Sequence, residues 1–195
     1  LLTSVLDSTG KVTGYIEECS RLKIPVLPPD INSSDMGFTV SQEGIRFGLL
    51  AIRNLGRNVI ADMIAERQNG PFETFNEFCE RMHGKDLNRR GLESLIKSGA
   101  FDRIHPNRRQ LLMGYEPLLA GLDAVKQKNL EGQLGFFDMM ADQPKEEYQF
   151  PQLEDFPLSE KLSQEKEVTG MYLSGHPLGE YADLIPRLGT AKIAH

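Results

Sequence analysis

The sequence predicts a mainly α fold, in which a tandem helix-hairpin-helix domain follows a small N-terminal β-hairpin. A partly disordered linker and a C-terminal helix are expected after that domain. Two observations predict the tandem domain: apolar residues recur with a helical period, and short glycine-containing turns interrupt them at 54–56 and 98–102. A third observation separates the linker, because residues 126–157 are polar and lack any sustained period.

The N-terminal part is expected to contain one helix and one hairpin. Residues 8–22 place Val12, Tyr15 and Ile16 on one helical face. Residues 23–27 are expected to be extended, because Pro25 and the following Pro28-Pro29 oppose a helix. Residues 38–40 and 45–47 alternate as strands do, and 41–44 would join them as a four-residue loop.

The first helical hairpin centres on Asn54-Leu55-Gly56, with one helix before it and another beginning just after Gly56. The first N–H groups of that second helix lack intrahelical partners and lie at its positive dipole end, which suits a phosphate. Arg53 and Arg57 flank this end. Asn54 and Ile60 depart from the usual glycine and small residue, so an ordinary αα-hairpin without a ligand remains the alternative.

Two further helices lead into and out of a second hairpin. Thr74 is expected to cap a helix with Phe75, Phe78, Cys79 and Met82 inward, and Glu77 completes a capping box. Asn88 caps the next helix, which ends with Gly99 in the left-handed conformation. Another helix starts near Asn107. Phe101 stands where the motif would have glycine. The two hairpins together would present two phosphate sites side by side.

Charge is distributed unevenly along this chain of net charge -6. Residues 45–110 hold twelve Lys/Arg against eight Asp/Glu, whereas residues 126–167 hold five against ten. The basic side chains surround both hairpins, which favours sequence-independent contact with the DNA backbone. The predicted DNA-binding residues are Arg53, Asn54, Leu55, Gly56, Arg57, Lys85, Arg89, Arg90, Lys97, Gly99, Arg103, Arg108 and Arg109.

An apolar island, Gln133-Leu-Gly-Phe-Phe137, interrupts the polar linker, and such an exposed aromatic pair is typical of a docking peptide.

Ser159 is expected to cap a helix that runs to about Leu173, and a short helix is expected at 180–185. Cys19 and Cys79 are expected to be free thiols. No catalytic or metal-ligating constellation and no membrane span is evident. The first residue is Leu1 rather than Met, which suggests a fragment or a processed product.

Five blocks resemble, in order and spacing, the bacterial replicative DNA polymerase III alpha subunits (family C). They are Tyr15-Ile-Glu-Glu-Cys19, Val26-Leu-Pro-Pro-Asp-Ile-Asn32, Gly44-Ile-Arg-Phe-Gly-Leu49, Leu92-Glu-Ser-Leu-Ile-Lys-Ser-Gly-Ala-Phe-Asp102 and Tyr172-Leu-Ser-Gly-His-Pro-Leu178.

The resemblance implies four regions: the end of the fingers at 1–44, a tandem hairpin domain that holds duplex DNA at 45–125, a flexible linker at 126–157, and a helical connector to an OB-fold at 158–195. It identifies Gln133, Leu134, Gly135, Phe136 and Phe137 as a sliding-clamp motif.

The resemblance also implies a cytoplasmic protein whose partners are duplex DNA, the sliding clamp and other replisome subunits. The parent would be a DNA-directed DNA polymerase, but its palm and the magnesium held there have no counterpart here. This fragment is therefore expected to need no cofactor and to be inactive alone. The alternative is a non-catalytic protein-interaction scaffold whose hairpins do not bind DNA.

Overall fold

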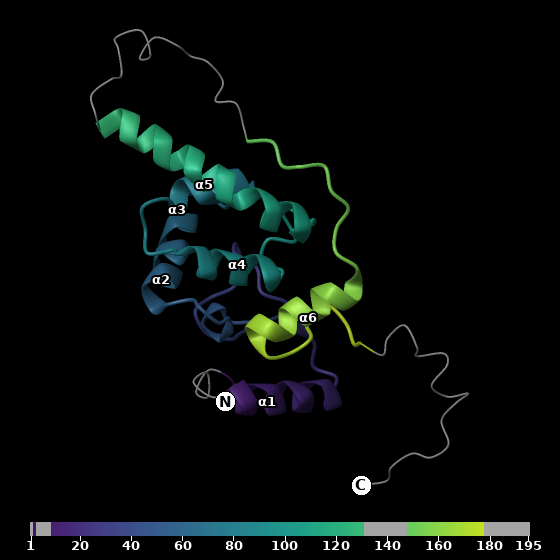
Figure 1. Cartoon of the computed structure of the whole chain (residues 1–195). Coiled ribbons are helices and arrows are strands. Elements are labelled where there is room, and N and C mark those ends of the chain that lie inside the picture. Colours follow the sequence, from purple (N-terminus) through teal and green to yellow (C-terminus); the bar gives the residue numbers. More distant parts are fainter. Residues whose placement is uncertain (1, 3–8, 131–147, 178–195) are drawn as a thin grey trace.

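The computed structural model describes residue 2 and residues 9–130 and 148–177 (Figure 1). Their fold is mainly α-helical with a small sheet, as predicted. In Figure 1 the long helix α5 lies along one side of the hairpin helices, and α1 lies at the opposite end of the molecule. The α-helices are α1 (Thr9–Arg21), α2 (Arg57–Glu66), α3 (Phe75–Met82), α4 (Arg89–Lys97), α5 (Arg108–Leu130) and α6 (Leu158–Thr169).

The sheet has three short strands in the order β1-β3-β2: β1 (Val26–Leu27), β3 (Gly44–Arg46) and β2 (Thr39–Ser41). The predicted four-residue loop is wrong, because Ser41 and Gly44 pair with each other and only two residues form the turn. Gly44 has φ +143°, and a Cβ there would lie 2.3 Å from the carbonyl oxygen of Pro25. Glycine therefore lets the parallel strand β1 approach β3, an arrangement that the sequence analysis missed.

The core of the hairpin helices is a cluster of phenylalanines. The ring centre of Phe101 lies 4.8 Å from that of Phe75 and 4.9 Å from that of Phe78, both edge to face. Phe72 joins the cluster at 5.0 Å from Phe78. Such pairs bury large apolar areas in a favoured geometry. Phe101, which departs from the hairpin motif, is therefore a core residue.

The N-terminal segment is fixed to the hairpin helices by side chains that bond to backbone groups. Asn32 exchanges two hydrogen bonds with the backbone of Phe72, at 2.9 and 2.8 Å. Arg67 lies in the 3₁₀ turn η3 (Arg67–Asn69) after α2 and donates to the carbonyl oxygen of Ser34 at 2.6 Å and to Asp35 at 2.6 Å. The sheet and the hairpin helices therefore share one core.

The predicted linker is shorter than expected at both ends. Helix α5 continues through Pro117 to Leu130. Residues 148–157 contact α3 and α5 before α6, because Asn76 donates to the carbonyl oxygen of Tyr148 and the amide of Arg109 donates to Asp155. Helix α6 begins at Leu158 with Pro157 as its N-cap, not Ser159, and it ends at Gly170 in the left-handed conformation. The predicted clamp motif at 133–137 and the predicted helix at 180–185 lie outside the described residues.

Candidate nucleic-acid interface

The first hairpin has an unequal pair of helices. The helix predicted before the turn is only the 3₁₀ turn η2 (Leu49–Ala51), and α2 begins just after Gly56 as predicted. The positive φ falls on Asn54, at 63°, whereas Gly56 is extended with φ -85°. The amide of Arg53 donates to the carbonyl oxygen of Val168 at 2.8 Å, so this backbone turns away from the helical path to meet α6.

The N-terminus of α2 is open. Gly56 is its N-cap, and no side chain caps the helix. A Cβ added at Gly56 would meet nothing within 4 Å, so the approach to the first amides is unobstructed. Ile60, the other departure from the motif, is completely buried and belongs to the core instead of the hairpin surface. The first N–H groups and the positive end of the α2 dipole are therefore available to an anion.

The start of α4 lies beside the start of α2, and both line one shallow depression of about 270 Å³. The side chain of Asn54 donates to the hydroxyl of Ser94 on α4 at 3.0 Å. Asn88 caps α4 by accepting from the amide of Gly91 at 2.8 Å. The residues that line the depression are Asn54, Gly56, Arg57, Asn58, Val59, Asp86, Leu87 and Asn88. The two adjacent helix starts thus belong to α2 and α4, not to α2 and α5 as predicted.

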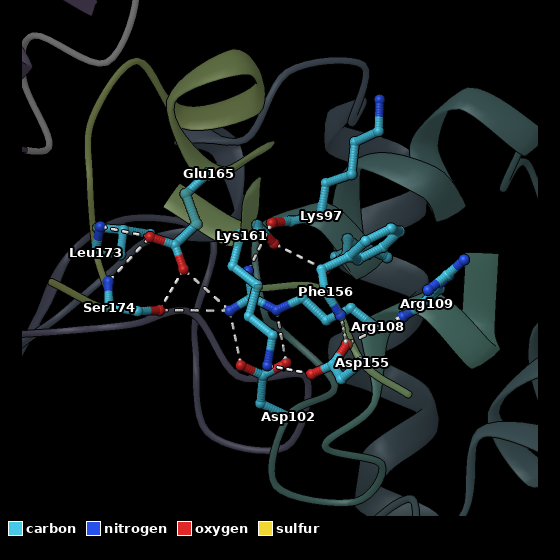
Figure 2. A network of polar contacts seen from close by, with 12 residues as sticks. Lys97, Asp102, Arg108, Arg109, Asp155, Phe156, Lys161, Glu165, Leu173 and Ser174 are labelled. Atoms are coloured by element: carbon cyan, nitrogen blue, oxygen red, sulfur yellow. Dashed lines mark hydrogen bonds and ion pairs between the residues drawn. The ribbon is translucent and has the colours of Figure 1, made fainter. Parts of the chain in front are cut away.

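The second hairpin is built around a buried ion network (Figure 2). The guanidinium of Arg108 lies 2.7 Å from a carboxylate oxygen of Asp102 and 3.0 Å from one of Glu165. The side chain of Arg108 is 2% exposed and that of Glu165 is 0% exposed. Gly99 faces this network, since a Cβ there would lie 2.3 Å from Nη2 of Arg108. Arg108 and Gly99 are therefore structural residues, and their assignment to DNA binding is corrected.

The N-terminus of α5, the predicted second phosphate site, is already occupied by side chains of the chain itself. Asn107 accepts from the amide of Gln110 at 3.0 Å, and Asp155 accepts from the amide of Arg109 at 3.3 Å. Burial opposes ionisation of Asp155, but hydrogen bonds from Lys161 and from backbone amides lower its pKa overall. A phosphate would have to displace this carboxylate, so the second hairpin differs from the open first one.

The other predicted basic residues fall into those that form an ion pair and those that do not. Four have acidic partners: Lys85 with Glu66, Arg89 with Glu116, Lys97 with Glu167, and Arg103 with Asp30. The guanidinium of Arg109 lies 5.9 Å from the ring centre of Phe156. Within the described residues, Arg53, Arg57 and Arg90 are exposed and form no ion pair, and they lie at or next to the α2–α4 depression. Leu55 is buried, so only its backbone belongs to this surface.

The sequence did not predict two carboxylates that determine the structure of the second hairpin: Asp155 at the start of α5 and Glu165 beside Arg108. Asp155 lies in the predicted linker and Glu165 in the predicted helix after it, and no local pattern connects either residue to a hairpin about 50 residues earlier.

In the described part of the chain, no helix is long and apolar enough to cross a membrane, and no cluster of metal-ligating side chains is found. Cys19 and Cys79 are free thiols, as predicted.

Comparisons with known proteins find one matching motif family and several similar proteins. Residues 23–111 match the helix-hairpin-helix motif family. The chain is 39% identical to the DNA polymerase III subunit alpha of Neisseria meningitidis serogroup B, over 98% of this chain and 17% of that protein. It is 37% identical to the Escherichia coli K12 subunit over 96% of this chain, and 35% identical to that of Borreliella burgdorferi over 98%. The chain spans about one sixth of the length of these relatives.

Proposed function

We propose that this chain, which is similar over nearly its whole length to one segment of the DNA polymerase III alpha subunit, binds the backbone of duplex DNA. The observation that carries the proposal is the uncapped start of α2, with Arg53 before it and Arg57 in its first turn. A phosphate placed there would accept hydrogen bonds from backbone amides and lie beside guanidinium groups.

The chemistry of this surface predicts how it binds. Amide and guanidinium contacts to phosphate carry no base information, so affinity is independent of sequence. Each phosphate neutralised releases counterions and contributes about 0.9 to the slope of log affinity against log salt. The surface is small, because the Arg109 and Gln110 amides at the start of α5 already have side-chain partners and four of the basic residues have acidic partners. Binding is therefore weak and salt-sensitive, which suits a segment that holds DNA while it moves.

The test is binding of the whole chain to two duplexes of unrelated sequence, measured by fluorescence anisotropy at about 50 to 200 mM salt. We expect Arg57→Glu with Arg90→Glu to weaken binding to both duplexes at least tenfold and to make the salt slope shallower by about 2. Arg21→Glu is the charge control, because the side chain of Arg21 is 74% exposed and lies on α1. Equal affinity of the double variant and the control would favour the protein-scaffold alternative.

We also propose that Gln133–Phe137 binds a sliding clamp and so supports processive synthesis. The support comes from the sequence, since Leu134, Phe136 and Phe137 can fill an apolar pocket and Gln133 can bond at its rim. The described chain on either side belongs to the folded part: α5, which packs into the core through Leu111 and Leu118, runs to Leu130, and the carbonyl oxygen of Tyr148 accepts from Asn76 at 3.0 Å. A bound clamp would thus be tethered to the hairpin helices, and shared DNA would raise its effective concentration.

Replacing Phe136 and Phe137 with Ala tests the clamp proposal. Clamp binding, expected near micromolar or about -8 kcal/mol, should vanish while the melting temperature stays nearly constant. Met139→Ala with Met140→Ala is the matched control, because these residues lie in the same segment outside the motif. A large fall in melting temperature, with no clamp binding by the unaltered chain, would mean that the aromatic pair belongs to the core.

A further inference from the structure

A small pocket lies between α6 and the turn that follows it. Leu162, Ser163 and Lys166 of α6 form one side, and Tyr172 and His176 form the other. Its volume is about 170 Å³. An engineered cavity of about 150 Å³ is known to accommodate benzene, so this pocket has room for one six-membered ring. The α2–α4 depression does not include any of these residues.

The side chains of the pocket combine an aromatic surface with positive charge. The ring centres of Tyr172 and His176 lie 6.5 Å apart, and the ring planes meet at 66°. Nζ of Lys166 lies 3.1 Å from the hydroxyl oxygen of Tyr172 and 4.9 Å from the centre of its ring. Tyr172 is 37% exposed. Among the described residues that line the pocket, no side chain is a carboxylate. A ligand that is both planar and anionic fits this surface.

The turn that carries Tyr172 is held in place by the buried network of Figure 2. Oε2 of Glu165 accepts from the amides of Leu173 at 2.7 Å and Ser174 at 2.9 Å, and its other oxygen accepts from Arg108. Burying a charge pair contributes little to stability compared with apolar packing. What the network does provide is a fixed backbone directly after Tyr172, which preorganises this side of the pocket.

We propose that this pocket binds one unpaired base of single-stranded DNA, with the base against Tyr172 and a neighbouring phosphate at Lys166. Aromatic rings beside basic groups bind single strands without base preference, because every base has a π face. The inference rests on the proposed DNA-binding role but uses a different surface. The hairpin surface would hold paired DNA through its backbone, and this pocket would hold an unpaired base.

The experiment measures binding of a labelled oligothymidine and of a duplex to the whole chain. Tyr172→Leu keeps apolar bulk but removes the ring, and it should weaken oligothymidine binding about 5- to 50-fold. Tyr172→Phe keeps the ring and should stay within about twofold of the unaltered chain. Duplex affinity should be unchanged in both variants. Arg57→Glu with Arg90→Glu should show the opposite pattern, with duplex binding lost and oligothymidine binding largely kept.

Three results would overturn the inference. The first is full oligothymidine affinity in Tyr172→Leu. The second is equal loss of oligothymidine and duplex binding in that variant, which would make the ring a structural residue. The third is Tyr172-dependent binding of thymidine monophosphate without binding of the oligomer, which would identify a free nucleotide as the ligand. If the chain binds oligothymidine through Tyr172 but does not bind duplex DNA, the result supports the proposed pocket. The same result contradicts the proposed function of the hairpin surface.

Discussion

The guanidinium of Arg108 joins three elements through one planar group. It donates to Asp102 in the second hairpin, to Glu165 on α6, and to the carbonyl oxygen of Lys97 at the end of α4. A lysine has no such fork of donors and could not hold these partners together. The full burial of Glu165 depends on this cation, because an unpaired charge is strongly disfavoured away from water.

Arg108→Ala should therefore lower the free energy of unfolding by about 3 to 5 kcal/mol, because it leaves Glu165 buried without its cation. Arg103→Ala is the control: Arg103 is 66% exposed and 3.7 Å from its carboxylate, and such pairs contribute less than about 1 kcal/mol. Urea unfolding followed by circular dichroism gives both values. Equal effects of the two substitutions would show that the network does not carry this energy.

Glu66 makes the stability of the fold depend on pH. Hydrogen bonds from Lys85, Asn69 and Arg81 lower the pKa of its carboxyl from 4.5 to about 2. Because the folded pKa lies below the unfolded one, ionised Glu66 stabilises the fold above about pH 4.5. That contribution is lost as the pH falls toward 2.

We expect the difference in urea midpoint between the unaltered chain and Glu66→Gln to be constant near neutral pH and to shrink between about pH 4.5 and 2. Glu116→Gln serves as control, because Glu116 is 58% exposed and pairs, among the described residues, only with Arg89, which is itself 67% exposed. A difference for Glu66→Gln that persists unchanged to pH 2 would contradict the lowered pKa.

At the scale of elements, local signals predicted the helix ends that depend on local chemistry. Thr74 and Asn88 cap α3 and α4 as predicted, and Gly99 has φ +81°. The helix expected before Asn54 is a single 3₁₀ turn, since the amide of Arg53 bonds to α6 instead of continuing a helix. That partner lies far along the chain, so no local pattern could reveal it.

The packing of residues 148–157 also could not be predicted from local sequence. It lacks a helical or strand period, yet its aromatic side chains pack against the hairpin helices. The ring centre of Phe150 lies 5.7 Å from that of Phe75 and 5.2 Å from that of His105. Gly114 on α5 makes room, because a Cβ there would lie 2.5 Å from the ring of Phe150. The polar composition of this segment predicted a linker. The residues that it packs against lie elsewhere in the sequence, so the packing could not be recognised from the segment alone.

Phe150→Ala should release this segment from α3 and α5. Core Phe→Ala substitutions remove about 3 to 5 kcal/mol, and for the half-buried Phe150 we expect about 2 kcal/mol. Limited proteolysis should then cleave within 148–157 much faster than in the unaltered chain. Gln152→Ala changes an exposed residue of the same segment and should leave the cleavage rate unchanged. Equal cleavage in all three chains would mean that Phe150 does not anchor the segment.

At the scale of the whole molecule, the hairpin helices and the N-terminal segment behave as one packed unit. Ile31 and Phe47 belong to the same core as the hairpin phenylalanines. The match to the helix-hairpin-helix motif family spans residues 23–111 and so includes the sheet. The helical class and the start of α2 just after Gly56 were predictable from sequence, because period and turn chemistry are local. The blocked phosphate site at the start of α5 was not predictable, because Asp155 meets the amide of Arg109 only in the folded chain.

We propose that duplex DNA binds at the open start of α2 and not at the occupied start of α5. Amide NMR of the ¹⁵N-labelled chain, titrated with duplex DNA, tests it most directly. We expect the amides of residues 56–59 and 89–90 to shift with DNA concentration, with those of 108–110 unchanged. Shifts at 108–110 in the absence of any at 56–59 would mean that DNA binds at the start of α5 instead.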